Sequence, residues 1–139
     1  MNIELTNQIY EDLESYLTEK SKYSPRVVAK SLKQSDKFPL VVVTENNNST
    51  SLASTDFKDN TDIINISVNI YAQDKAIGNE TIADVVIARE LMKLVDDVVG
   101  VKYKMQRIDC RPTPNLDNSI YRITMNYSKK IMTKRNILI

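Results

Sequence analysis

A chain of 139 residues with 42% hydrophobic and 27% charged residues has the length and composition of one globular domain. It contains one cysteine and no histidine, and its formal net charge is +1. One cysteine excludes an intrachain disulfide bond. The absence of a run of about 18 apolar residues predicts no membrane-spanning segment, and the acidic N-terminus is unlike a secretory signal, so we expect an intracellular protein.

The charges are divided unevenly along the chain. Residues 1–100 carry 10 basic and 16 acidic residues, a net charge of −6, whereas residues 101–139 carry 9 basic and 2 acidic residues, a net charge of +7. This polarity predicts a subunit with an acidic side and a basic side, which other copies or an acidic partner can recognise. The alternative is two solvated surfaces that bind no partner.

The first predicted element is a helix over residues 3–20. Its apolar side chains fall on one arc at 100° per residue, and its acidic side chains, including Glu11 and Glu14, fall on the other. The apolar arc is typical of core packing, whereas the acidic arc faces either solvent or a basic partner. Residues 21–37 are polar and basic, and a short helical turn is predicted over residues 27–32.

Two strands with different patterns follow. Residues 38–45 (FPLVVVTE) are apolar and β-branched, which predicts a buried strand with its proline at the start or on an edge. Residues 63–73 alternate between apolar and polar side chains, which predicts a half-buried strand antiparallel to the first. Residues 46–62 between them have no periodicity and predict a long loop, a kind of segment that is often functional.

A second helix is predicted over residues 81–100. Thr81 and Asp84 have the spacing of a capping box, with Thr81 as the N-cap, and Gly100 is placed to end the helix. The apolar arc of this helix is wider than one sheet face needs. Either the first helix or a neighbouring subunit is therefore expected to cover the remainder.

Residues 103–110 and 120–130 predict two closing strands, joined by a turn rich in proline, aspartate and asparagine. The element order is helix, strand, strand, helix, strand, strand. We therefore predict an α+β fold, in which a mainly antiparallel β-sheet is packed by two α-helices. A single domain is expected over residues 1–131, followed by a C-terminal tail over residues 132–139.

The sequence lacks the residues that most enzymes use. No histidine is available as a general base or metal ligand, and two glycines cannot build a phosphate-binding loop. Cys110 has no histidine partner and is expected to be a packed residue. Asp96 and Asp97 are neighbours on a helix and point about 100° apart, so solvation is favoured over Mg²⁺ binding. We predict no enzyme, no metal and no cofactor.

Nucleic-acid binding is a further possibility for the basic C-terminal part. Its cations are interleaved with tyrosines, a composition that suits phosphate contacts and base stacking. Tyr121 and Tyr127, however, share one strand face with Ile123 and Met125, which indicates core positions. Sequence-specific binding is not predicted, and loose electrostatic contact with DNA stays open.

The order and texture of these elements resemble a known family. The FPLVVVTE and IINISVNIYAQD strands, the TIADVVIARELMKLVDDVVG helix and the closing strand YRITMNYSKK are similar to those of tail terminator and head–tail joining proteins of tailed phages and phage-derived contractile particles. The resemblance covers residues 1–131. It implies a ring, usually a hexamer, that caps the tail tube, ends its polymerisation and joins it to the neck.

The resemblance implies a homo-oligomer that contacts the tube, with sheath or neck proteins as further candidate partners, in a virion or tail-like particle assembled in the bacterial cytoplasm. A head-closure or neck connector and a transient tail-assembly chaperone are the alternatives. Basic residues could line a DNA channel, although lumens in the family are often acidic. Charged side chains are the candidate contacts of the subunit or tube interface: Glu11, Glu14, Asp56, Lys58, Arg122, Lys129, Lys130, Lys134 and Arg135.

Overall fold

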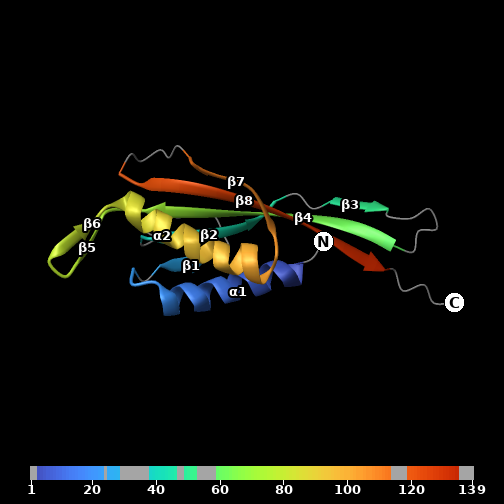
Figure 1. Ribbon diagram of the computed structural model, residues 1–139, viewed down its shortest axis with the longest axis horizontal. Helices are drawn as coiled ribbons and strands as arrows, with labels where there is room; N and C mark the ends of the chain where they lie inside the picture. The colour runs from blue at the N-terminus through green and yellow to red at the C-terminus, as the bar shows by residue number, and fades with distance from the viewer. Residues whose placement is uncertain are drawn as a thin grey trace.

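The computed structural model describes residues 3–23, 25–28, 38–46, 49–52, 59–113 and 119–134. These residues form a β-sheet with two helices packed on one of its faces, as Figure 1 shows. The predicted α+β fold with a mainly antiparallel sheet is confirmed. The described residues contain more strands than predicted, because several short strands accompany the four predicted ones.

The sheet has one central ladder with shorter strands beside it. Its strands lie in the order β1 (Arg26–Val28), β2 (Leu40–Glu45), β4 (Asp59–Ala72), β8 (Tyr121–Lys134) and β7 (Gln106–Pro112). The β1–β2 pair is parallel, and the other described pairs are antiparallel. A further strand, β3 (Ser49–Leu52), pairs with the first part of β4, and β5 (Lys75–Ile77) and β6 (Glu80–Ile82) form a separate hairpin.

Both helices pack against the same face of the sheet. The helix α1 (Ile3–Lys20), which matches its prediction, contacts β1, whereas α2 (Asp84–Asp96) contacts β4 and β8. The two helices also touch each other, so α1 covers part of the wide apolar arc of α2. Val86 on α2 stays 46% exposed. The shared core contains side chains from every layer, including Leu13, Leu91, Ile66 and Met125.

Two predictions about the first half of the chain are wrong. Residues 46–62 are not one long loop, because β3 and the beginning of β4 lie within them. Serine, threonine and asparagine pair there through their backbone groups, so the strands need no apolar alternation. Residues 27–28 belong to β1 and not to a helical turn, because these valines pair in parallel with β2. Leu32 lies outside the described residues.

Both predicted ends of the second helix are also wrong. Thr81 lies in β6, and the N-cap is Ala83, which makes no side-chain cap hydrogen bond. The carboxylate of Asp74 instead accepts a hydrogen bond from the backbone N–H of Asp84 at 2.8 Å. Gly100 does not end the helix, since the helical path continues as a π-helical segment, η1 (Asp97–Lys102).

The closing strands are shifted toward the C-terminus. The strand β7 begins at Gln106 and not at residue 103, because η1 continues to Lys102 and Lys104 has a positive φ of 56°. The strand β8 extends to Lys134, so the boundary predicted at residue 131 falls inside a strand. Figure 1 shows that β3 and the adjoining ends of β4 and β8 extend beyond the helices as a projecting arm.

Candidate functional site

The face of the sheet that carries no helix is the first candidate surface, and its side chains form rows across the strands. One row joins Arg26, Leu40, Tyr71 and Arg122. The guanidinium of Arg122 lies 5.3 Å from the ring centroid of Tyr71, within the range of a cation–π contact. Leu40 and Tyr71 belong to a small apolar cluster on this side, separate from the main core.

The next rows form a polar hydrogen-bonded network. The side-chain oxygen of Asn69 accepts hydrogen bonds from Thr124 at 2.7 Å and from two nitrogens of Arg122 at 3.0 and 3.2 Å. Ser67 and Asn69 are each only 8% exposed. The predicted half-buried strand is therefore more covered on its polar side than expected, because neighbouring strands lay their side chains over it.

The network continues to the far edge of the sheet through Asn126. Its carbonyl oxygen accepts a hydrogen bond from Ser67 at 2.5 Å, and its amide donates to Asp109 at 2.7 Å. Asn46 donates to the hydroxyl of Ser67 from the end of β2. Three strands are thus linked by side-chain hydrogen bonds, which fixes the positions of these polar groups.

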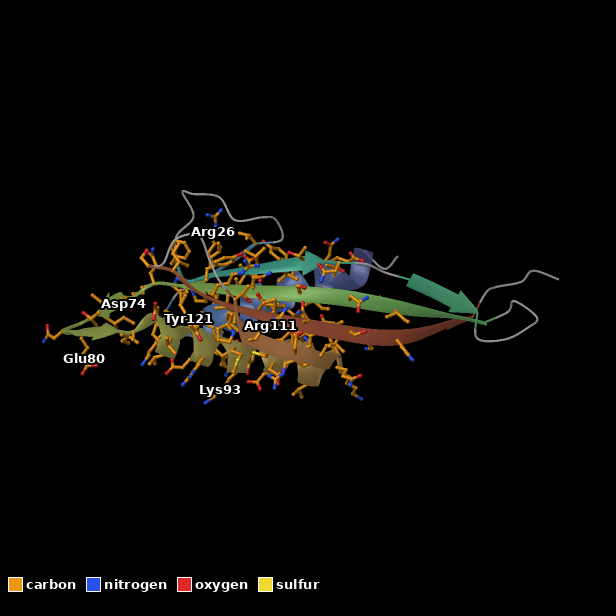
Figure 2. The ribbon with its side chains drawn as sticks, turned by 90° about the horizontal axis from the view of Figure 1, so that it is seen from above. Arg26, Asp74, Glu80, Lys93, Arg111 and Tyr121 are labelled. Atoms are coloured by element: carbon orange, nitrogen blue, oxygen red, sulfur yellow. The ribbon has the colours of Figure 1, made fainter. Side chains whose placement is uncertain are left out.

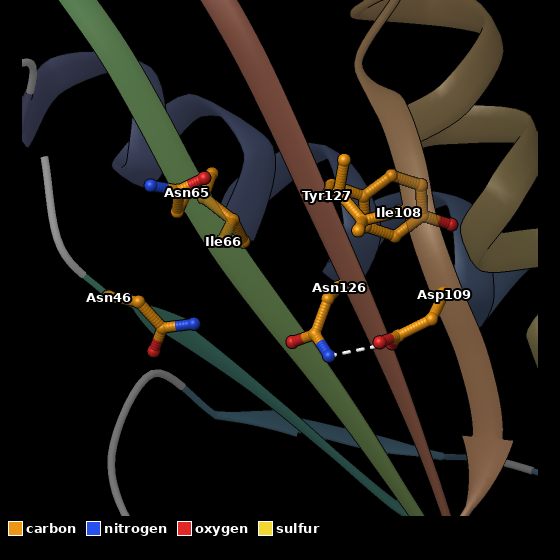
Figure 3. A pocket seen from close by; sticks show the side chains of 7 residues that line it. All are labelled: Asn46, Asn65, Ile66, Ile108, Asp109, Asn126 and Tyr127. Atoms are coloured by element: carbon orange, nitrogen blue, oxygen red, sulfur yellow. Dashed lines mark hydrogen bonds between the residues drawn. The ribbon is translucent and has the colours of Figure 1, made fainter.

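An open pocket of about 340 Å³ lies beside this network, as Figure 3 shows. The single carboxylate in its lining, Asp109, already accepts the hydrogen bond from Asn126. The lining offers amides, one carboxylate and apolar side chains, a set suited to weak polar contacts and without a nucleophile beside a base. It is lined by Asn46, Asn65, Ile66, Ile108, Asp109, Asn126 and Tyr127.

The described charges on this helix-free face are mostly basic. Arg26, Arg111 and Lys130 are exposed, and Arg122 is half-buried. Asp109 is the one acid among the described side chains of the face, and it is engaged with Asn126. Figure 2 shows Arg26 and Lys93, which lies on α2, pointing away from opposite sides of the molecule.

The helices have the opposite charge. The segment α1 contains five acidic residues and one lysine, a net charge of −4, and α2 with η1 contains four acidic and three basic residues, a net charge of −1. The predicted charge polarity therefore follows the two faces of the molecule more closely than the two halves of the chain. Arg26 from the acidic half joins the basic face, and Lys102 from the basic half pairs with Asp12 on α1 at 2.8 Å.

The edge of the sheet at β1 carries a groove. It lies between α1 and β1 and has a volume of about 500 Å³. The hydroxyl of Tyr10 donates a hydrogen bond across it to the carbonyl oxygen of Val27 at 3.2 Å. The groove combines apolar side chains with one acid and one base, and is lined by Tyr10, Glu14, Thr18, Pro25, Arg26, Val27 and Val28.

The opposite edge of the sheet is formed by β7, and it contains a β-bulge. The register with β8 shifts between Arg107 and Asp109, which leaves Ile108 as the extra residue. Ile108 is 59% exposed, one of the most exposed large apolar residues described. Arg107 beside it is also exposed, and its guanidinium lies 3.9 Å from the carboxylate of Asp96.

Two tyrosine–aspartate contacts lie at the two ends of η1. The hydroxyl of Tyr103 and the ammonium of Lys102 both donate to Asp12 on α1, and these hydrogen bonds, that of Lys102 first, lower the pKa of Asp12 below its ordinary value. The hydroxyl of Tyr127 donates to Asp96 at 2.8 Å. Burial, followed by that hydrogen bond, raises the pKa of Tyr127. Each contact joins a helix to another element. The carboxylates of Asp12 and Asp96 therefore have a structural role.

The remaining candidates for chemistry have ordinary packing roles. Cys110 lies with its sulfur 3.0 Å from that of Met92, and burial raises the pKa of its thiol. Asp97 accepts a hydrogen bond from Tyr16 at 3.2 Å. Within the ranges that the structure describes, no group of three or more aspartate, glutamate, cysteine or histidine side chains could hold a metal ion.

The structure separates the predicted interface residues. Glu11 and Glu14 are exposed on α1, and Lys130 is exposed on the helix-free face. Lys129 instead lies on the helix-covered face, where its ammonium donates to the carbonyl oxygen of Tyr103 at 2.6 Å. Lys134 ends β8, where it pairs in register with Asp59. Asp56, Lys58 and Arg135 lie outside the described residues.

Three notable surface residues were not predicted: Arg26, Arg107 and Ile108. The position of Arg26 could not be predicted because β1 is only three residues long, which is too short to show a period. The sequence does contain a signal for Ile108. Ile108 and Cys110 are both apolar and two residues apart, so regular alternation places them on the same face of the strand. In the structure only Cys110 faces the helices. A bulge reconciles the two, but the sequence does not distinguish a bulge from regular alternation.

None of the described helices is long and apolar enough to span a membrane. Comparison of the sequence with protein-family models and with curated proteins finds no significant match.

Proposed function

We propose that this chain is a structural subunit that joins copies of itself edge to edge into a ring, and that the ring caps a phage-type tail tube and ends its growth. The observation that carries the proposal is the complementarity of the two edges of the sheet. One edge has the groove between α1 and β1, with Glu14 in its lining. The other has the exposed Arg107 and Ile108 on β7.

The strand directions at the two edges favour such a contact. The strands β1 and β2 are parallel, and each of the three steps from β2 through β4 and β8 to β7 is antiparallel, so β1 and β7 run in opposite directions. In a ring whose axis follows the strands, β7 of one copy therefore approaches β1 of the next in antiparallel orientation. Such a heterologous contact closes into a ring when the rotation between copies divides the circle.

The side chains at the edges also complement one another. An exposed isoleucine on β7 suits the apolar part of a groove that contains Val27 and Pro25. Arg107 can approach Glu14, so that the contact joins opposite charges and sets the orientation of the copies. The bulge at Ile108 makes continuous backbone pairing unfavourable, which assigns the contact to side chains.

The projecting arm of β3, β4 and β8 supports the capping part of the proposal. It extends beyond the helices and thus away from the edges assigned to the ring (Figure 1). Repeated around a ring, the arms form a second surface that can meet the last layer of a tube. The resemblance to tail terminator proteins implies a tail tube as that partner.

The ring is tested by native mass spectrometry and electron microscopy of the purified protein. We expect a closed ring, whereas Arg107→Glu and Glu14→Arg each give monomers, and the double variant restores the ring because the ion pair is re-formed with exchanged signs. Arg89→Glu on the exposed face of α2 is the matched control and leaves the ring intact. A wild-type chain that stays monomeric at high concentration contradicts the proposal and favours a transient chaperone.

Capping is tested separately by adding the ring to tube subunits during polymerisation. A terminator shortens the tubes and lies at their ends in electron micrographs. A ring that forms but neither binds the tube ends nor changes their length supports the neck connector instead.

A further inference from the structure

The helix-free face has the charge of a nucleic-acid contact surface, and we propose that it binds the phosphate backbone of duplex DNA without sequence preference. Arg26, Arg111 and Lys130 are exposed on it, and Arg122 is half-buried beside them. The one described acid of the face, Asp109, is held by Asn126. Phosphate contacts need clustered cations with few competing carboxylates, and this face provides both conditions.

The opposite side of the molecule makes the attraction directional. The helices carry a net negative charge, with α1 at −4. A polyanion is therefore attracted to the sheet and repelled by the helices, and the chain approaches DNA with its helix-free face first.

The positions of the cations suit an extended backbone. Arg26 and Arg122 lie in one row, three strands apart, which separates their backbone positions by roughly 14 Å. Arg111 lies in the next row on β7, and Lys130 lies further along β8. Separated cations can each meet a different phosphate, and Arg122 is already oriented by its contacts with Asn69 and Tyr71.

The shape of the face excludes direct reading of the bases. A duplex is read when a helix or a narrow ribbon enters its major groove, which is about 12 Å wide. This face is a sheet of at least four strands whose side chains are largely bonded to one another. It therefore contacts the outside of the duplex, and we expect weak, salt-sensitive binding with a dissociation constant of about 10⁻⁴ to 10⁻⁶ M.

This inference goes beyond the ring, because a single copy carries the whole face. In a ring joined edge to edge, every copy would present Arg111, Arg122 and Lys130, whereas Arg26 borders the groove assigned to the ring contact. A DNA molecule passing the ring would still meet many weak contacts. Weak contacts spread over many copies hold DNA without fixing it at one position.

The test uses fluorescence anisotropy with a labelled duplex of random sequence at several salt concentrations. We expect the wild-type protein to bind at low salt, with a log–log slope that indicates about three to four phosphate contacts. Arg111→Glu/Lys130→Glu weakens binding at least tenfold and flattens the slope. The matched control, Arg89→Glu/Lys93→Glu, makes the same change of charge on α2. The change that it causes in the logarithm of the dissociation constant should be less than half of that caused by Arg111→Glu/Lys130→Glu.

Arg122 is left unchanged in this test, because its replacement would disturb the hydrogen bonds to Asn69. Failure of the wild-type protein to bind, or equal loss in both double variants, overturns the proposal. Native mass spectra of the same variants separate it from the ring. If Arg111→Glu/Lys130→Glu abolishes the ring while wild-type protein ignores DNA, the face is a protein interface and the inference is wrong.

Discussion

The two faces of the sheet solve different problems with the same strands. On the helix-covered face, alternate residues such as Ile66 and Met125 are fully buried against α1 and α2. On the other face, their neighbours Ser67 and Asn126 bond to each other across the strands. Apolar burial is favourable in proportion to the area removed from water, whereas a hydrogen bond mostly exchanges a bond to water for one within the protein. The first face therefore supplies stability, and the second supplies a fixed polar surface.

Truncating one side chain on each face measures how much each face contributes to stability. Leu91→Ala, on the helix-covered face, should lower the free energy of unfolding by about 2–5 kcal/mol, because it leaves a cavity beneath α2. Asn126→Ala on the other face should cost about 1–2 kcal/mol, because it removes two hydrogen bonds, with Ser67 and with Asp109, that water replaces in part. Urea denaturation of the two variants measures the difference. Equal losses would show that the polar network is as important to stability as the core.

The second prediction concerns a polar contact on the helix-covered face. Tyr127→Phe removes the hydroxyl that donates to Asp96 and should cost about 1.5–3 kcal/mol, the usual value for a hydrogen bond to a charged group. The aromatic ring of residue 127 stays buried in this variant, so thermal and urea unfolding should report the loss of the hydrogen bond alone.

A second substitution, at Gly100, tests whether this effect acts through Asp96. A Cβ at Gly100 would lie 2.8 Å from the carboxylate oxygen of Asp96 that accepts this bond. Gly100→Ala should therefore be less damaging in the Tyr127→Phe background, where the carboxylate is free to move. Strict additivity of the two changes would argue against coupling through Asp96.

The helix-covered face is also the part that the sequence predicts well. The period of α1 and the alternation of Ile64, Ile66, Val68 and Ile70 follow directly from burial on one side, and these positions are buried as predicted. These patterns can be read from the sequence because every apolar residue in them packs against the same core.

The missed features depend on partners that are distant in the sequence. Thr81 has the local spacing of a cap, but Asp74 from the other side of the β5–β6 hairpin bonds the first helical N–H group. The strand β3 has no apolar period, since its pairing with β4 is a matter of backbone bonds. The basic face could not be predicted for the same reason, because Arg26 and Arg122 become neighbours in a row only through β2 and β4.

The third prediction concerns the hydrogen-bonded network on the helix-free face. Asn69→Ala leaves the hydroxyl of Thr124 and the guanidinium of Arg122 without their shared acceptor. Because Asn69 is 8% exposed, water replaces the lost bonds only in part, and we expect a loss of about 1–2 kcal/mol. Asn69→Asp keeps the acceptor and should retain more stability than alanine. The unfolding midpoints in urea rank the three proteins.

The smallest expected effect is a pH dependence at the contact between α1 and η1. Asp12 has a pKa below its ordinary value of 3.8, because Lys102 and Tyr103 donate hydrogen bonds to its carboxylate. A carboxyl group whose pKa is lower in the folded state stabilises the protein above the unfolded pKa, and this contribution is lost as the pH falls through the folded pKa. The contribution should therefore be present near neutral pH and disappear in acid.

Asp12→Asn should reduce the stability near neutral pH and flatten the loss of stability as the pH falls through and below the ordinary pKa of 3.8. The effect is small because the pair is largely exposed and water screens it, so it is best measured as a difference in thermal midpoints along a pH series. Glu11→Gln removes the same charge from the adjacent position of α1, and thus controls for net charge. If both variants flatten the curve equally, the acid sensitivity arises from the charge of α1 as a whole, and the contact with Lys102 and Tyr103 has no separate role.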